Sequence, residues 1–560
     1  MSIVSNLQKN ICSALKKAAL TGREKGELVF EELPDFVLEV PREKSHGDFA
    51  TNLAMLLTKK AKMPPRQIAE VLVKHFSRQN TWVEELEIAG PGFINFRLDT
   101  GWLDRVLPQV ELLGEKYGHS RVGAGQKVQV EFVSANPTGL LHMGNARGAA
   151  LGDTIANLLA AAGFEVEREY YINDAGNQIE NFGKSLEARY LQAFGQDVPF
   201  PDEGYHGEDI LATVNRIIEQ DGDKYLGIDS GLRREFLIKF GLEEKLSHIR
   251  AVLERFGVRY DRWFSEQSLH DSGMIEAVLK ELDQNGYVYE EEGALWLKGT
   301  DLGLEKDEVL VKNNGLPTYY AADIAYHLDK LKRGFTWMIN LWGADHFSHV
   351  ARMEAGLQAL GHDPKQLTVV VMQLVRLFSQ GEIIRMSKRT GQYITLSELM
   401  DEVGTDAARY FFVMRSADSH LDFDLDLAKE ESSENPVYYV QYAHARISSI
   451  LRQAAEEGIQ LKSISQCNPL LLRDSSELEL LRKLADFPEV VREAALALEP
   501  HRLTRFAGEL AGLFHAFYTN CRVLNSDPEL RDVRLVLVNA TKTTLQNLLK
   551  LIGVKAPERM

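Results

Sequence analysis

Hydrophobic and polar positions follow two different periods in the first part of the chain. Apolar side chains recur every three to four positions over residues 3–20 and 65–76, as they do on one face of a helix, and residues 46–63 have a helical composition with a basic end. Residues 84–98 instead have the pattern of two strands joined by a Gly-Pro-Gly turn. Helices combined with a strand pair predict an α+β domain over residues 1–110.

Strands and helices alternate in the middle of the chain. Residues 127–133 alternate polar and apolar positions before turning wholly apolar, residues 144–163 form a predicted helix rich in small residues, and residues 165–172 are again strand-like. This order predicts a βαβ unit, whose helix start faces any ligand above the sheet. Residues 337–350 repeat the strand, the glycine turn and the helix start. We therefore predict an α/β fold with a parallel sheet.

Two further stretches are mainly helical. Residues 180–265 are helical and charged, with a predicted loop at residues 190–209. From residue 435 onward, amphipathic spacing marks helices at residues 439–455, 477–498, 501–520 and 534–553. The last part of the chain is therefore predicted to be a helical bundle.

Composition is that of a globular protein. The chain has 560 residues, 44% of them apolar and 26% charged, and no apolar run of the roughly eighteen residues that a membrane span needs. The start is too polar for a signal peptide, and Cys12, Cys467 and Cys521 lack the paired spacing of a zinc site or a disulfide framework. We expect a cytoplasmic protein of about three to four domains with no membrane partner.

The acidic charge is unevenly distributed. The net charge is −17, yet residues 441–560 carry 16 Lys and Arg against 14 Asp and Glu, so the acidic surplus lies in the first 440 residues. Composition alone would not suggest a nucleic-acid partner. Binding to a nucleic acid depends on where the cations lie, however, because charges act over a Debye length of about 10 Å.

The start of the helix at residues 144–163 is a candidate phosphate site. His142 and Asn145 flank Gly144, so two short polar side chains stand where unpaired backbone N–H groups and a partial positive charge favour an anion. Neither the dinucleotide fingerprint nor the P-loop pattern is present. One histidine and one glycine at a helix start are common in α/β proteins, so this pattern alone is weak.

A basic stretch far downstream supports the phosphate interpretation. Arg385, Lys388 and Arg389 lie within GEIIRMSKRTG, residues 381–391, after the apolar strand-like residues 367–375. Such cations suit a negative charge that develops in a transition state. The alternative is an ordinary solvated basic turn.

These two motifs carry a family resemblance. HMGN at residues 142–145 resembles the HIGH signature of class I aminoacyl-tRNA synthetases, and RMSKR at residues 385–389 resembles their KMSK signature. Asn145 replaces the last histidine of the first motif, and Arg385 replaces the first lysine of the second. The surrounding sequence is similar to arginyl-tRNA synthetases of the bacterial type over essentially the whole chain, in VEFVSANPTGLLHMGNARGA, YYINDAGNQI, LPTYYAADIAYHLDK, GTDAARYFFVMRSADSHLDFDLD and LLKLIGVKAPERM.

The resemblance implies three domains. They are an N-terminal additional domain at residues 1–110 that contacts the tRNA elbow, a class I Rossmann-like nucleotide-binding catalytic domain at 115–430 with an insertion around 180–265, and an α-helical anticodon-binding domain at 435–560. The implied partners are tRNA(Arg), L-arginine and ATP, with Mg²⁺ arriving as part of the ATP complex and no tightly bound cofactor. The protein is expected to be a monomer.

The implied activity is that of an arginyl-tRNA synthetase. Arginine would be activated by ATP to arginyl-adenylate and transferred to the 3′ end of tRNA(Arg), which gives AMP and diphosphate. The catalytic residues would be His142, Asn145, Arg385, Lys388 and Arg389. The ATP site would contain His142, Gly144, Asn145, Gly343, Asp345, His349, Met386, Ser387 and Lys388. Whether arginine activation requires bound tRNA stays open.

Arginine as a substrate makes a specific demand on its pocket. A guanidinium group is planar, always charged and rich in donors, so carboxylates should face it. The resemblance assigns the arginine contacts to Glu131, Asn136, Tyr319 and Asp323. The i, i+4 spacing of the last two places them on one helix face. Alternatively, Asp323 is a surface carboxylate and Tyr319 a core aromatic residue.

Several residues keep more than one interpretation. Asn173, Asp174, Asn177 and Gln178 follow a predicted strand and belong either to the rim of the site or to a plain turn. Asp345, His346 and His349 could share a metal ion, although no metal site is expected. Tyr438, Tyr439, Tyr442, His444 and Arg446 are either anticodon contacts or core residues.

Three other functions remain open at this point. The chain could activate a different amino acid, although Glu131 and Asp323 argue against this. It could be a small-molecule adenylating ligase, which would leave the helical last third without a purpose. It could also be a catalytically inactive tRNA-binding paralogue, because Asn145 and Arg385 depart from the usual signatures.

Overall fold

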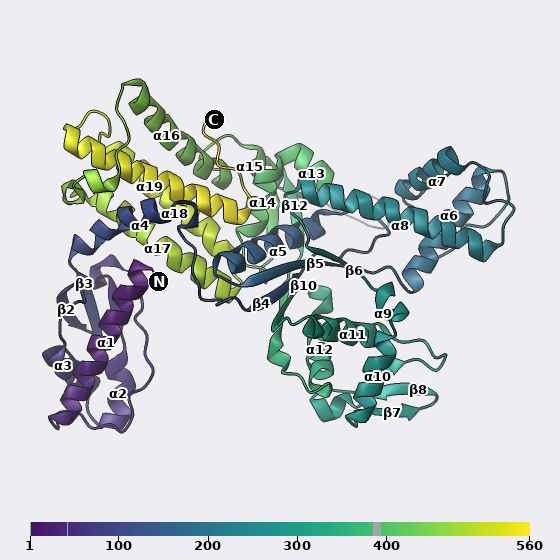
Figure 1. Cartoon of the computed structure of the whole chain (residues 1–560), viewed down its shortest axis with the longest axis horizontal. Coiled ribbons are helices and arrows are strands. Elements are labelled where there is room, and N and C mark those ends of the chain that lie inside the picture. Colours follow the sequence, from purple (N-terminus) through teal and green to yellow (C-terminus); the bar gives the residue numbers. More distant parts are fainter. Residues whose placement is uncertain (1, 42, 385–393) are drawn as a thin grey trace.

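The computed structural model describes residues 2–41, 43–384 and 394–560. Figure 1 shows a central sheet with a separate unit at the N-terminus, a group of helices projecting from the opposite side, and a helical bundle formed by the last part of the chain. The predicted site residues on the basic stretch, Arg385, Met386, Ser387, Lys388 and Arg389, lie outside the described residues.

The N-terminal unit packs three helices on an antiparallel sheet. Its elements are α1 Ile3–Glu24, β1 Phe49–Thr51, α2 Leu53–Ala61, α3 Pro65–His75, β2 Val83–Ala89 and β3 Phe93–Leu98, with strand order β1-β3-β2. The single helix expected over residues 46–63 is wrong. Phe49 and Thr51 are buried on either side of the less buried Ala50, which is the two-residue period of a strand. The helix starts only at Leu53 because residues 49–51 pair with β3.

The central sheet has five parallel strands in the order β11-β10-β4-β5-β6, which confirms the predicted α/β fold. The strands are β4 Lys127–Glu131, β5 Glu165–Ile172, β6 Arg262–Ser265, β10 Trp337–Gly343 and β11 Leu367–Met372. The chain leaves β4 toward β5 on one side and reaches β10 on the other, so the strand order reverses at β4 and β10. Ligands of such sheets bind beyond the carboxyl ends of the strands at this reversal.

Helix α5 Met143–Ala161 follows β4, is buried along nearly its whole length and contacts β4, β5 and β10 of the sheet. Its small residues allow this close packing. A methyl group on Gly152 would overlap the Phe132 ring, and one on Gly148 would lie 3.1 Å from Met372. The small-residue composition therefore brings the start of α5 close to the strand ends.

The insertion forms the helical projection on the right of Figure 1. It contains α6 Asn177–Ala193, α7 Glu208–Asp221 and α8 Ser230–Arg255, and the chain then returns to the sheet in β6.

A second cluster of helices and strands follows β6. Its helices are α9 Gln267–Asp271, α10 Met274–Gln284, α11 Tyr319–Lys332 and α12 Phe347–Ala359. They lie beside an antiparallel sheet of β7 Val288–Glu291, β8 Ala294–Leu297 and β9 Glu308–Val311.

The remaining elements join the central sheet to a helical bundle. A small sheet of β12 Val375–Ser379, β13 Glu382–Ile384 and β14 Leu421–Asp424 lies with α13 Leu396–Val403, α14 Thr405–Val413 and α15 Leu425–Lys429. The bundle contains α16 Pro436–Glu456, α17 Ser475–Ala497, α18 His501–Asn520 and α19 Pro528–Ile552, and α4 Val106–Leu113 packs on it. None of the helices in the described part of the chain combines the length and apolar character needed to cross a bilayer.

Candidate active site

The start of α5 is held by a reciprocal pair of hydrogen bonds. The His142 backbone N–H donates to Asn145 Oδ1 at 3.1 Å, and His142 Nδ1 accepts from the Gly144 backbone N–H at 3.1 Å. Because Nδ1 is an acceptor, a neutral His142 ring carries its proton on Nε2, where it can donate to an anion. Asn145 therefore fixes both the helix start and the position of the histidine.

The chain that follows the basic stretch returns to this helix start. Thr395 forms an antiparallel bridge with His142, and the Leu396 N–H donates to the Leu141 carbonyl oxygen at 2.9 Å. Thr395 also caps α13 through Glu398, whose carboxylate accepts from the Thr395 N–H at 2.8 Å. Thr395, which lies beside His142, is thus only six positions after Arg389 in the sequence.

The residues predicted to hold the nucleotide divide into two groups. Gly343 ends β10, and Asp345 follows it in a 3-10 turn, Ala344–His346, with a largely exposed carboxylate. His349 instead contacts α11, where its Nε2 lies 2.7 Å from Asp323 Oδ2. No group of three or more His, Cys, Asp or Glu among the described residues is placed to hold a metal, so the structure does not support the metal interpretation of Asp345, His346 and His349.

Two of the predicted arginine contacts lie on the first turns of α11. Tyr319 is 54% exposed, so it is not a core aromatic residue. Asp323 has a side chain that is 29% exposed and paired with His349, so it is not a fully solvated surface carboxylate either. Both side chains therefore lie at the boundary between protein and solvent, which suits a pocket wall.

The other two predicted contacts differ in burial. Glu131 is buried at the end of β4, where its carboxylate accepts from Lys330 Nζ at 2.7 Å and from Ser134 Oγ at 3.1 Å. Lys330 is itself fully buried and also donates to Asn340 Oδ1 at 2.9 Å. Asn136 is exposed, and its Oδ1 accepts from Asn173 Nδ2 at 3.1 Å. Of these two predicted contacts, Glu131 is thus buried and Asn136 is exposed to solvent.

The polar cluster after β5 shapes the neighbouring loop. Asp174 accepts from Ser265 Oγ at 2.6 Å and from the Gln267 N–H at 2.9 Å. Asn177 and Gln178 belong to the first turn of α6. Asp174 therefore fixes the turn between β6 and α9. One further residue lies in this turn, between Ser265 and Gln267.

That residue is Glu266, which the sequence interpretation missed. It is 5% exposed, and burial, together with the negative charge of Asp323, raises its pKa to about 7, while a hydrogen bond with Tyr171 acts in the opposite direction. Glu266 and Asp323 reach the same region from different elements. The available signal was its position directly after a strand, at the carboxyl edge of a parallel sheet.

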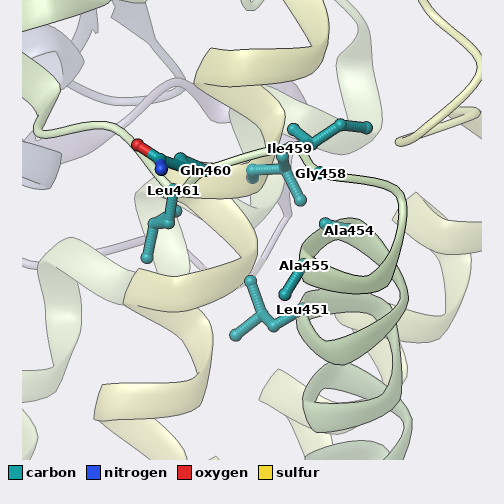
Figure 2. A pocket seen from close by; sticks show the side chains of 8 residues that line it. Leu451, Ala454, Ala455, Gly458, Ile459, Gln460 and Leu461 are labelled. Atoms are coloured by element: carbon teal, nitrogen blue, oxygen red, sulfur yellow. The ribbon is translucent and has the colours of Figure 1, made fainter.

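A pocket of about 470 Å³ lies far from these groups, in the helical bundle. Figure 2 shows its lining from the end of α16 and the following loop, and Leu535 of α19 completes it: Leu451, Ala454, Ala455, Gly458, Ile459, Gln460, Leu461 and Leu535. The lining contains no charged side chain. A triphosphate and a guanidinium need charged partners, so this pocket does not suit either of them.

The bundle also carries an aromatic face on α16 and α18. The Tyr438 and Tyr442 rings are stacked with centroids 6.2 Å apart, and the Arg446 guanidinium lies 4.9 Å from the Tyr442 centroid and 5.2 Å from that of Tyr518. Tyr439 packs on His515 with centroids 5.0 Å apart.

His444 differs from these neighbours, because it is fully buried and its Nδ1 donates to the Pro557 carbonyl oxygen at 2.7 Å. Of the residues considered as anticodon contacts, His444 therefore belongs to the core.

Sequence families match the chain in three consecutive regions. Residues 107–419 match the family described as tRNA synthetases class I (R), catalytic domain, and residues 440–560 match the DALR anticodon binding domain. Together with the parallel sheet and the capped helix start, these matches define a class I aminoacyl-tRNA synthetase. Residues 5–98 match the arginyl tRNA synthetase N terminal domain.

Full-length relatives narrow the family further. The chain is 62% identical to the arginine–tRNA ligase of Moorella thermoacetica and 61% identical to that of Heliobacterium modesticaldum, with complete coverage of both chains in each case. The chain therefore belongs to the arginyl-tRNA synthetase family, and the family resemblance is confirmed.

Solved structures agree with this assignment. The arginyl-tRNA synthetase of Thermus thermophilus has a TM-score of 0.74 at 25% identity, covering 98% of this chain and 100% of its own. A putative arginyl-tRNA synthetase of Campylobacter jejuni has a TM-score of 0.76 at 33% identity, covering 83% of this chain and 100% of its own.

Proposed function

We propose that the protein is an arginine–tRNA ligase that activates L-arginine with ATP and transfers it to the 3′ end of tRNA(Arg), giving AMP and diphosphate. The observation that supports this most strongly is the pairing of two sites at one sheet edge. A helix start suited to phosphate lies beside β4, and the carboxyl groups of Asp323 and Glu266 lie where a cation would be stabilised.

The guanidinium group of arginine would bind between Asp323 and Glu266. A guanidinium offers five donors in a planar fork, so two carboxylates on different elements can each accept from one edge. Tyr319 would cover the aliphatic part of the substrate, and Asn136 would contact its polar end. Glu131 would act from beneath, because its carboxylate already accepts from Lys330 and Ser134.

ATP would bind as its Mg²⁺ complex across the start of α5. His142 and Asn145 would hold the phosphates, and Gly144 would allow their close approach. Gly343 and Asp345 would face the ribose, with the Asp345 carboxylate accepting from its hydroxyl groups. Arg385, Met386, Ser387, Lys388 and Arg389 would bring the positive charge that balances the leaving diphosphate. His349 would act on the arginine side, because it contacts Asp323.

Each of the two chemical steps is a displacement, the first at phosphorus and the second at a carbonyl carbon. An oxygen of the arginine carboxylate attacks the α-phosphorus of ATP, and the bond to the β-phosphate bridging oxygen breaks as diphosphate leaves. The terminal ribose hydroxyl of tRNA then attacks the arginyl carbonyl carbon, loses its proton, and AMP leaves. These steps need positioning and charge stabilisation rather than a covalent enzyme intermediate.

The tRNA would contact both ends of the protein. The N-terminal domain, residues 1–110, would bind the tRNA elbow, and the helical domain, residues 435–560, would bind the anticodon loop. Unstacked bases are recognised by stacking on aromatic and guanidinium planes. The face formed by Tyr438, Tyr442, Arg446 and Tyr518 presents such planes in one group. The protein would act as a monomer in the cytoplasm.

The direct test is arginine-dependent exchange of diphosphate into ATP, followed by arginylation of tRNA(Arg). Exchange with arginine alone among the amino acids is expected, and running it with and without tRNA shows whether activation requires the RNA. Exchange with another amino acid instead would contradict the proposed specificity. Binding of tRNA without any exchange would identify a catalytically inactive paralogue.

A further inference from the structure

One buried arginine joins three parts of the molecule. Arg409 on α14 is fully buried, and its guanidinium donates to the Ile552 carbonyl oxygen from Nε at 3.0 Å and from Nη2 at 2.8 Å. It also donates from Nη1 to the Phe256 carbonyl oxygen at 3.0 Å and from Nη2 to Asp153 Oδ2 at 2.6 Å. These acceptors belong to the helical bundle, the insertion and the active-site helix.

The two backbone acceptors are at helix ends. Ile552 is the last residue of α19, and Phe256 caps the C-terminus of α8. Terminal carbonyl groups lack partners within their helix and carry its partial negative charge, so a cation stabilises both ends at once. Gly553, at φ 74°, leaves no room for a side chain, because a methyl group there would overlap the Arg409 guanidinium.

The third acceptor belongs to the helix that begins at His142. Asp153 is eight residues beyond Asn145, about 12 Å along α5. Its neighbour Asn157, one turn further on, donates to the Leu551 carbonyl oxygen at 3.1 Å and to Asp153 Oδ2 at 3.3 Å. Two successive carbonyl groups of the last turn of α19 are therefore bonded to this cluster, one by α5 itself and one by Arg409.

This connection is stiff and sensitive to position. α19 is a continuous helix of 25 residues, about 37 Å long, and it packs on α16 and α18, which carry the aromatic face. A buried charge that loses a hydrogen-bond partner costs several kcal/mol, so Arg409 strongly favours one relative placement of its partners. A displacement of α19 would therefore change the environment of Asp153 on α5.

We propose that Arg409 is a positioning residue that couples tRNA binding on the helical domain to the substrate site at the start of α5. The coupling rests on the proposed function, because it requires the helical domain to bind tRNA and α5 to bind ATP. Arg409 touches neither substrate. It acts by holding the end of α19 against Asp153, so that RNA bound to the bundle favours the arrangement of α5 in which arginine binds well.

The test is a comparison of two buried arginines. Arg409→Lys keeps the charge but cannot reach three acceptor groups with one ammonium. Arg233→Lys is the matched control, because Arg233 on α8 also donates to backbone carbonyl groups, those of Tyr225 and Leu226, and to Glu187, all within the insertion. Arginine affinity is measured by calorimetry without tRNA and with saturating tRNA, and thermal unfolding is recorded for each protein.

The coupling is the ratio of the two arginine affinities. We expect a ratio of about fivefold or more for the unaltered protein and for Arg233→Lys, and a ratio close to one for Arg409→Lys. Linkage requires tRNA affinity, measured with and without arginine, to change by the same ratio. A purely structural defect would lower both affinities equally and leave the ratio unchanged, which would overturn the proposal. A ratio of one in the unaltered protein would overturn it as well.

Two controls separate the failure modes. If Arg409→Lys does not fold, Asp153→Asn takes its place, since it keeps an oxygen acceptor and removes only the charge; an unchanged ratio there overturns the proposal. Exchange of diphosphate into ATP is measured on the unaltered protein in the same preparation. Loss of coupling alongside normal exchange in the unaltered protein supports the inference, whereas absent exchange with arginine contradicts the proposed function itself.

Discussion

At the scale of single residues, Glu266 of the proposed arginine pocket would link arginine binding to proton release. Burial and the charge of Asp323 raise its pKa to about 7, so the group is about half protonated near neutral pH. A guanidinium placed between the two carboxyl groups would favour the ionised form of Glu266. Arginine would then displace a proton, and its affinity would depend on pH in the range where Glu266 titrates.

We expect arginine affinity to rise about tenfold from about pH 6 to about pH 8, because the ionised fraction of Glu266 rises by that factor across a pKa of about 7. Calorimetry in buffers of different ionisation enthalpy measures both the affinity and the proton release. Glu266→Gln should weaken binding and flatten the profile. Glu276→Gln, at an exposed position of α10, is the control and should leave the profile unchanged. An identical profile in both variants would exclude Glu266 from the pocket.

The same carboxyl group should lower stability at neutral pH. Its pKa in the folded protein lies above the ordinary carboxyl value, so between the two values the folded state binds more protons than the unfolded state. Stability contributed by this group therefore falls as pH rises from about 4.5 to about 7. Glu266→Gln should raise the thermal midpoint relative to the unaltered protein at pH 8 but not at pH 4. A difference of the opposite sign would show that Glu266 has a stabilising partner when it is ionised.

Asn145 combines a structural role with its proposed role in phosphate binding, and substitutions can separate the two. Asn145→Asp keeps the acceptor for the His142 N–H and should preserve thermal stability, but its negative charge should raise the KM for ATP by about tenfold or more. Asn145→Ala removes the acceptor and should cost about 1 kcal/mol of stability. Exchange kinetics and denaturant unfolding on both variants provide the comparison. Normal ATP kinetics in Asn145→Asp would place the phosphates elsewhere.

At the scale of elements, the position of the start of α5 depends on how closely this helix approaches the sheet. Gly148 lies against Met372 of β11, and the ring of Phe132, the residue after β4, fills the space at Gly152. This close approach brings α5 into contact with both β4 and β10. The small-residue pattern that predicted close packing therefore also determines where the start of α5 lies.

Gly152→Ala should destabilise the protein by about 1–3 kcal/mol, because the added methyl group forces the helix away from Phe132. Gly508→Ala in α18 is the matched control. It is also a helical glycine, but a methyl group there meets no atom within 4 Å, so it should stabilise the protein by about 0.5–1 kcal/mol. Denaturant unfolding measures both. If both substitutions changed the free energy of unfolding equally, the residues around Phe132 would be able to shift and accommodate the added methyl group.

Elements with a strong period could be predicted from the sequence, and weakly periodic ones could not. The helices of the bundle and the strands β4, β5 and β10 lie where the pattern placed them. Residues 49–51 were misread because three residues are too few to show a period, and only their pairing with β3 makes them a strand. Residues 367–375, predicted as one strand, contain β11, which ends at Met372, and only the first residue of β12, Val375, which belongs to a different sheet.

At the scale of the whole molecule, the groups that the sequence did not reveal depend on distant partners. His142 and Asn145 were predicted as phosphate contacts because their motif is local. For Glu266 the only sequence signal was its position after a strand, since the burial and the Asp323 charge that raise its pKa arise from residues far along the chain. Likewise, the sequence marks Arg409 only as a helical residue. The structure shows that its guanidinium donates to carbonyl groups at the ends of α8 and α19. Long-range packing, rather than local pattern, defines these positions.

At the scale of the whole molecule, the net charge of −17 opposes binding to the negatively charged RNA backbone. Residues 441–560 carry 16 Lys and Arg against 14 Asp and Glu, so attraction to phosphate is weak there and stacking should contribute a large share of anticodon affinity. Tyr442→Ala should lower tRNA affinity by about 1–3 kcal/mol, while Tyr442→Phe, which keeps the ring, should bind almost normally. Tyr289→Ala, which removes a ring stacked on Trp296 in β8, is the matched control.

These affinities are best measured by filter binding or fluorescence at several salt concentrations, because loss of stacking and loss of charge give different slopes. Tyr442→Ala should shift the affinity without changing its salt dependence, and Arg446→Ala should reduce both if its guanidinium also contacts phosphate. Arginine affinity without tRNA should stay unchanged in each variant. If Tyr442→Ala binds tRNA like the unaltered protein, the anticodon lies on another face of the bundle, and the stacked rings of α16 serve only to pack that surface.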